Sequence, residues 1–82
     1  MAKTDRFDYY DLMGKTFKMI KLVGISDKSF EDAAQNAVYE AKKSLSGLSW
    51  FEVKEHHGKI DDTGKIVEWQ IVMDVAFRIK SD

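Results

Sequence analysis

The 82-residue sequence contains no cysteine and no proline, and it has only five glycines. Without cysteine, neither a disulfide framework nor a thiolate metal site is available, which favours a cytoplasmic setting. Without proline or clustered glycine, nothing marks a linker between domains. No apolar run approaches the roughly 18 residues that a membrane helix needs. We therefore expect one small soluble domain, near the lower size limit for a single core, that oligomerisation would help to stabilise.

The sequence also lacks an excess of charge of either sign. Thirteen basic and fourteen acidic residues give a formal net charge of -1, and the sequence pI is about 6.1. Non-specific binding to nucleic acid depends on a positively charged surface, which this composition does not supply. DNA and RNA are therefore not expected as partners, and neither is a membrane.

The residues that are present indicate one strand, one helix and then two strands. Residues 17–25 are rich in apolar and β-branched types, as in a strand. A helix follows, because Ser29 can cap it, Asp32 completes a variant of the capping box, and apolar residues recur at three- and four-residue spacing as far as Leu45. Gly47 is placed to end this helix in a left-handed turn.

Two further strands are predicted at about 50–60 and 65–80, joined by the turn sequence DDTG. In the last strand, apolar side chains occupy every second position from Val67 to Ile79, which indicates one buried face and one polar face. The order β-α-β-β predicts an α+β fold: a three-stranded antiparallel sheet of order 1-3-2 with the helix on one face. Such a sheet leaves its edges and its second face uncovered, which favours self-assembly.

Trp50 stands out in the stretch LSWFEVKEHHGKI. Strict alternation places it with Glu52 and Lys54 on the polar side of the strand, opposite to Phe51 and Val53. By its parity in the last strand, Gln70 faces the same side. Two interpretations remain open from the residues: the indole packs against another subunit, or it stacks on a planar heterocycle whose edge a glutamine can hydrogen-bond.

Residues 17–80 resemble the dodecins, a family of small flavin-binding proteins. The matching stretches are KLVGIS, SFEDAAQNAVYEAKKSL, LSWFEVKEHHGKI and GKIVEWQIVMDVAFRI, which occur in the family's order. The resemblance implies a protomer whose three-stranded sheet wraps around its helix. It also implies a homododecameric shell that stores or sequesters flavin (riboflavin or FMN, with FAD a further candidate) without catalysis. It further implies that Trp50 stacks on the isoalloxazine ring, that its symmetry mate covers a second flavin, and that Gln70 hydrogen-bonds the polar edge of the ring.

The sequence departs from the family at His57, where many bacterial dodecins have an arginine. We expect His57 to contact a ribityl or phosphate oxygen, as a cation only when it is protonated. The choice among riboflavin, FMN and FAD therefore stays open. A shell that holds another ligand, such as coenzyme A, is the alternative function. Binding of a nucleic acid or protein strand to the Trp50 surface is the weakest hypothesis, because of the balanced charge.

Two residue pairs invite other hypotheses. His56 and His57 are neighbours in a strand, so their side chains point to opposite faces and are not expected to share a metal ion. Asp61 and Asp62 are interpreted as turn formers rather than as catalytic or calcium-binding carboxylates. We found no pairing of a nucleophile with a base, and therefore do not predict an enzyme.

Residues 1–16 fall outside the resemblance. This segment contains several large apolar or aromatic side chains, which is more than a simple solvated tail would carry. We expect it to dock on a neighbouring subunit or to fold over the surface of the shell, with complete disorder as the alternative. The apolar residues are Phe7, Tyr9, Tyr10, Leu12 and Met13.

Overall fold

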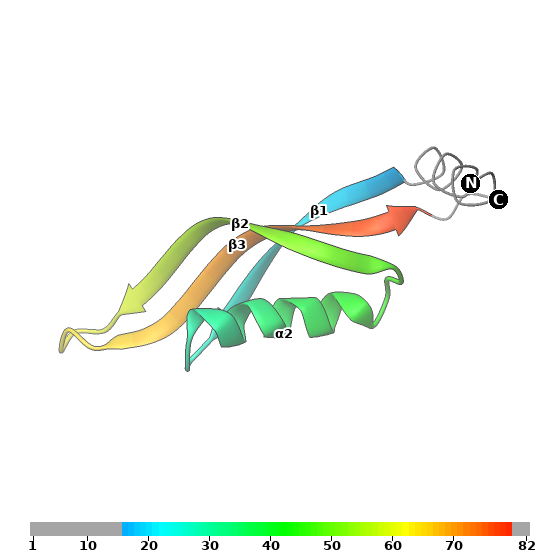
Figure 1. Ribbon diagram of the computed structural model, residues 1–82. Helices are drawn as coiled ribbons and strands as arrows, with labels where there is room; N and C mark the ends of the chain where they lie inside the picture. The colour runs from blue at the N-terminus through cyan, green and yellow to red at the C-terminus, as the bar shows by residue number, and fades with distance from the viewer. Residues whose placement is uncertain (1–15, 80–82) are drawn as a thin grey trace, which may run out of the picture.

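The computed structural model describes residues 16–79, which form a three-stranded antiparallel sheet with one helix packed on it (Figure 1). The elements are β1 (Thr16–Ser26), α2 (Phe30–Lys42), β2 (Leu48–Ile60) and β3 (Ile66–Ile79). β3 lies in the centre and pairs with both neighbours, which gives the strand order β1-β3-β2. This arrangement confirms the predicted α+β fold and the order 1-3-2. The prediction for the N-terminal arm lies outside the described residues, except that Thr16 already belongs to β1.

The N-terminus of α2 is capped as predicted. The Ser29 side chain accepts a hydrogen bond from the backbone N–H of Asp32 at 2.9 Å. Asp32 Oδ2 in turn accepts a hydrogen bond from Ser26 Oγ at 2.7 Å. The carboxylate therefore bonds to the end of β1, whereas in an ordinary capping box it would accept from the backbone N–H of the N-cap residue. Asn36 Nδ2 donates to the carbonyl oxygen of Ile25 at 3.0 Å. These contacts fix the start of the helix to the end of β1.

The C-terminus of α2 differs from the prediction, because the helix ends at Lys42 and does not reach Leu45. The last turn is irregular, and Leu45 N donates to the carbonyl oxygen of Ala41 at 2.9 Å. Serine is a weaker helix former than alanine, which favours such an early end. Gly47 has a left-handed conformation with φ 78°, but it lies in the loop, where its carbonyl oxygen accepts from Arg78 N at 2.9 Å.

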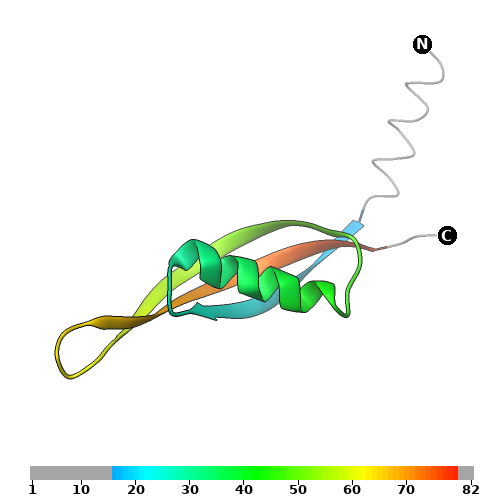
Figure 2. The same cartoon turned by 90° about the horizontal axis from the view of Figure 1, so that it is seen from below.

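Small residues allow α2 to lie unusually close to the sheet. The helix buries Ala33, Ala37 and Ala41, and it packs against β1 and β3. Opposite them in β1 is Gly24, where a Cβ atom would lie 2.0 Å from the carbonyl oxygen of Ala33. The helix covers one face of the sheet only, and the hairpin of β2 and β3 extends beyond it (Figures 1 and 2). The buried cluster consists of Ala33, Ala37, Ile71, Met73 and Val75.

The DDTG turn closes the hairpin of β2 and β3 as predicted. The Asp61 carboxylate accepts hydrogen bonds from Thr63 N at 2.9 Å and from Lys65 N at 3.1 Å, and Gly64 is left-handed with φ 87°. These contacts, above all the one from the Thr63 hydroxyl, lower the pKa of Asp61 below its ordinary value of 3.8. The ionised carboxylate therefore stabilises the turn fully above the ordinary pKa of 3.8, and this stabilisation is lost as the pH falls through the lowered pKa of the folded state.

The contact at Gly24 gives a first prediction. We expect Gly24→Ala to lower the free energy of unfolding by about 3 kcal/mol or more, because the added methyl group overlaps backbone atoms that have no room to move. The measurement is denaturant unfolding followed by circular dichroism.

Gly58→Ala in β2 is the matched control for this substitution. A Cβ atom there would lie 3.6 Å from the nearest atom, which is an ordinary contact distance, and the backbone conformation is open to any residue. We expect a change within about 1 kcal/mol. Equal effects of the two substitutions would contradict the close packing of α2 on β1.

Candidate functional site

The sheet has one face that α2 does not cover, and we call it the outer face. In an antiparallel sheet, paired residues point to the same side, so the pairing registers identify its members. The exposed apolar side chains Met19, Val23 and Ile25 of β1 lie on it, in addition to charged ones. Its members are Phe17, Met19, Lys21, Val23 and Ile25 from β1, Trp50, Glu52, Lys54, Glu55, His57, Lys59 and Ile60 from β2, and Ile66, Glu68, Gln70, Val72, Asp74, Ala76 and Arg78 from β3.

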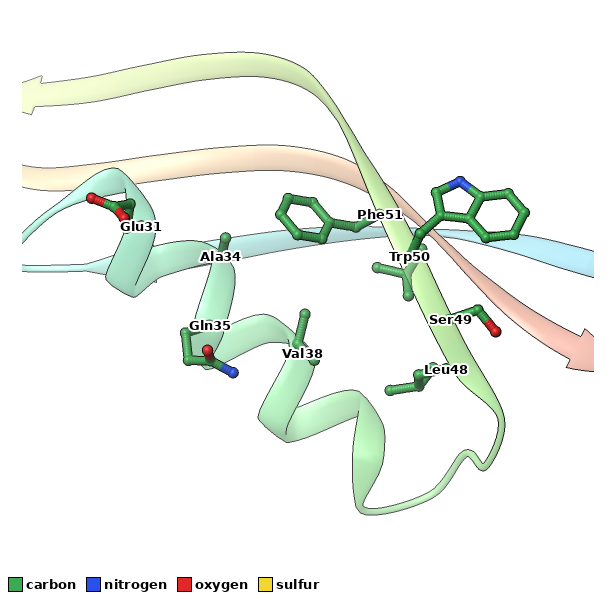
Figure 3. A pocket seen from close by; sticks show the side chains of 9 residues that line it. Glu31, Ala34, Gln35, Val38, Leu48, Ser49, Trp50 and Phe51 are labelled. Atoms are coloured by element: carbon green, nitrogen blue, oxygen red, sulfur yellow. The ribbon is translucent and has the colours of Figure 1, made fainter.

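Trp50 lies on the outer face near the start of β2. It pairs with Ala76 of β3, and half of its surface (50%) is exposed. Its neighbour Phe51 pairs with Val75 of the core, and the two rings leave the strand on different sides (Figure 3). As the sequence predicted, the indole lies outside the core of its own chain.

The alternation predicted for β2 is interrupted at Lys54. Val53 pairs with Met73 and Glu55 pairs with Val72, so Lys54 is an extra residue, a β-bulge, in this strand. Lys54 Nζ lies 3.5 Å from a carboxylate oxygen of Glu52 and 3.8 Å from one of Asp74, so Lys54 shares the side of Trp50 as predicted. After the bulge the parity is reversed, which brings Glu55 and His57 to the outer face.

The bulge decides which of the two histidines lies on the outer face. Strict counting from Trp50 would have placed His56 with it on the outer face. In the structure, His56 lies on the helix side, where its ring meets the Phe30 ring edge-on at a centroid distance of 4.9 Å. The two histidines lie on opposite faces, as predicted for neighbours in a strand. Within residues 16–79, no group of three or more His, Asp or Glu side chains is arranged to hold one.

His57 and Gln70 form a polar cluster at the far end of the outer face, where they pair directly across β2 and β3. His57 Nε2 lies 2.8 Å from Glu55 Oε1, and Gln70 Nε2 donates to Glu68 Oε2 at 2.6 Å. The ring and the amide are thus each oriented by a carboxylate from their own strand. A ligand that binds here meets two hydrogen-bonding groups beside two carboxylates, with Lys59 as the register partner of Glu68.

Trp50 and Gln70 share a face, but they do not meet within one chain. Trp50 lies beside Ala76 of β3, and Ala76 is six residues from Gln70 along that strand. At roughly 3.3 Å per residue this corresponds to about 20 Å along the strand. One tricyclic ring does not span that distance, so a single protomer cannot bring its own Trp50 and Gln70 to one ring.

A second feature near Trp50 is a groove between α2 and β2. Its volume is about 380 Å³, and it is present because α2 packs on β1 and β3 and leaves part of β2 uncovered. The Phe51 ring points toward this side, whereas the indole of Trp50 points away from it (Figure 3). The groove and the outer face lie on opposite sides of β2 and share Trp50 at their border. The groove is lined by Glu31, Ala34, Gln35, Val38, Leu48, Ser49, Trp50, Phe51 and Val75.

Two residues beside Trp50, Phe17 and Ala76, were not predicted to belong to the site. Phe17 of β1 reaches Trp50, with ring centroids 4.8 Å apart and planes inclined at 58°. Ala76 of β3 lies between them and is fully buried, although it has the outer parity. An aromatic residue at the first position of the 17–25 strand was the available signal. The burial of Ala76 has no signal in its own strand.

These features define a class: a small two-layer α+β domain whose open sheet face carries a half-exposed indole. The chain belongs to the dodecin family, because the model of that family, described as Dodecin, matches residues 16–80. The chain is 46% identical to dodecin from Thermus thermophilus over 68 residues, which are 83% of this chain and 97% of that protein. It is 33% identical to a protein named calcium dodecin from Mycobacterium tuberculosis, over 78% of this chain and 89% of that protein.

Solved structures agree with this assignment. A crystal structure from T. thermophilus superposes with a TM-score of 0.78 at 43% identity, and covers 84% of this chain and 100% of that one. Dodecin from Streptomyces coelicolor superposes with a TM-score of 0.77 at 34% identity, over 83% of this chain and 96% of that one. In the described part of the present chain, the one helix is too short and too polar to cross a membrane.

The different surroundings of the two histidines give a second prediction. We expect His56→Ala to lower the free energy of unfolding by about 1 kcal/mol, because it removes the edge-on contact with Phe30. His57→Ala should change it by less than about 0.5 kcal/mol, since this side chain is half-exposed and bonded only to an exposed carboxylate. Parallel urea titrations measure both. A larger loss for His57→Ala would contradict the reversed parity after Lys54.

Proposed function

We propose that the protein is a non-enzymatic flavin-binding protein that stores or sequesters riboflavin or a related flavin in a homododecameric shell. The observation that carries the proposal is the indole of Trp50, half-exposed on a sheet face that its own helix leaves uncovered. A large flat aromatic group held at the surface is suited to stacking on a planar ring. Membership in the dodecin family supports the same conclusion.

The separation of Trp50 from Gln70 favours a site built from more than one chain. At a two-fold axis, every contact occurs twice, so one tryptophan per chain becomes two facing walls. A pair of flavins between these walls would be covered by an indole on each outer side. The hydrogen bonds to the polar edge of a ring would then come from a Gln70 that belongs to another copy than the stacking Trp50.

The expected strength of binding is moderate. Each stacking contact is worth roughly 1 to 3 kcal/mol by analogy with aromatic stacking on nucleic-acid bases. For a ligand of roughly 27 heavy atoms, about 0.3 kcal/mol per atom gives about 8 kcal/mol, or a Kd near the micromolar range. When bound, the flavin would supply light absorption, and a tryptophan in contact with it can quench the excited ring by electron transfer. The role of the chain's own residues is to stack, orient and shield.

The third prediction tests the stacking role. We expect wild-type protein to quench the fluorescence of added riboflavin, and Trp50→Ala to weaken its binding by about 5- to 150-fold, the range that corresponds to one lost stacking contact. Fluorescence titration measures the affinity, and light scattering on the same samples checks that assembly is retained.

Trp69→Phe is the matched control for Trp50→Ala. Trp69 pairs with Ser26 and Gly58 on the helix side, so its replacement should leave riboflavin binding unchanged. A titration in which wild-type protein leaves riboflavin fluorescence unaltered would refute the flavin proposal. Coenzyme A as the co-purifying ligand, identified by mass spectrometry, together with binding that does not depend on Trp50, would favour the alternative function.

The charges around His57 bear on the choice of flavin. Glu55 and Glu68 are the hydrogen-bonding partners of His57 and Gln70, and Lys59 is the register partner of Glu68, so carboxylates outnumber cations among these paired residues. A phosphate monoester carries a charge of about −1.5 to −2 at pH 7. Because like charges repel, we propose that this chain prefers riboflavin to FMN, whose phosphate is such a monoester.

The fourth prediction follows from this preference. We expect His57→Arg to increase the affinity for FMN by about tenfold, because a guanidinium group binds phosphate in a bidentate manner at any physiological pH. The affinity for riboflavin should change by less than about threefold, since it has no phosphate group. Isothermal titration with both ligands gives the ratio. Wild-type protein that binds FMN more tightly than riboflavin, or equal gains for both ligands in the variant, would refute the preference.

A further inference from the structure

The contact between Phe17 and Trp50 joins the two outer strands of the sheet across the central one. β1 and β2 lie on either side of β3, at about 4.8 Å per strand, so their backbones are separated by roughly 10 Å. The rings nevertheless approach to a centroid distance of 4.8 Å. They do so by leaning toward each other over the outer surface of β3.

The residue beneath this contact is Ala76. Its register partners are Met19 in β1 and Trp50 in β2, and Phe17 is two residues from Met19 on the same face. Ala76 is fully buried, although α2 lies on the other side of the sheet. Its cover is therefore formed by these outer-face side chains. A methyl group is small enough to let the two rings meet above it, whereas a larger side chain would stand between them.

We propose that Phe17 is a positioning residue that holds the indole of Trp50 in the orientation for stacking, with Ala76 providing the space for the contact. The proposal rests on the flavin-binding function. At an inclination of 58°, the phenyl ring does not lie flat on the indole, and half of the indole surface stays exposed. Phe17 thus restrains Trp50 and still leaves area for a ligand.

A restrained indole binds more tightly than a mobile one, because less side-chain freedom is lost on binding. The conformational freedom that one side chain loses when it is immobilised on binding lowers the affinity by roughly 2- to 10-fold. In a site where two indoles face each other, both are restrained in the same way by their own Phe17. The contribution is made before the ligand arrives and needs no direct contact between Phe17 and flavin.

The fifth prediction has one readout without ligand and one with it. In a Trp69→Phe background, Trp50 is the only tryptophan, and its time-resolved fluorescence anisotropy reports the mobility of its ring. We expect Phe17→Ala to increase this mobility and to weaken riboflavin binding by about 2- to 10-fold. Phe17→Tyr keeps the ring and should restore both values. Ala76→Val should have the same effect as Phe17→Ala, although it removes neither ring.

Val23→Ala is the matched control, because it removes apolar surface from the outer face of β1 at a distance from Trp50. It should leave both readouts unchanged. Unaltered anisotropy of Trp50 in Phe17→Ala overturns the proposal, as does increased mobility with unaltered affinity. Failure of wild-type protein to bind any flavin would overturn the function instead, and the anisotropy would still decide whether Phe17 restrains Trp50.

Discussion

The close packing of one alanine-lined helix on β1 and β3 is the constraint on which the rest of the molecule depends. Gly24 and Ala33 bring the two layers into contact, and the core between them is complete without the second face of the sheet. A single helix has no further surface with which to cover that face. Among residues 16–79, no element covers the side chains of the outer face, and half of the Trp50 surface is exposed.

Much of the fold could be predicted because its signals are local. The alternation in β3, the Ser29 cap and the DDTG turn each depend on residues close in sequence, and all three are present in the structure. The end of α2 was predicted too late, because Gly47 serves the loop and its bond to Arg78 rather than the helix. From the sequence, a glycine that ends a helix cannot be told from one that belongs to the loop after it.

The site was harder to predict than the fold, because its arrangement depends on contacts between strands. The bulge at Lys54 has no clear signal in β2, where only the change from apolar Val53 to a run of polar residues coincides with it. The bulge nevertheless decides which histidine shares a face with Gln70. The burial of Ala76 depends on side chains from both other strands, so no pattern within β3 could have indicated it.

We expect assembly and ligand binding to be linked, because Trp50 and Gln70 of one chain lie too far apart on the outer face to contact the same flavin ring. The most direct measurement is light scattering with simultaneous visible absorption on the purified protein mixed with riboflavin. Twelve copies of the 9.5 kDa chain weigh about 114 kDa, and we predict a single species of this mass that absorbs blue light. A colourless species with the mass of one chain would contradict both the assembly and the site.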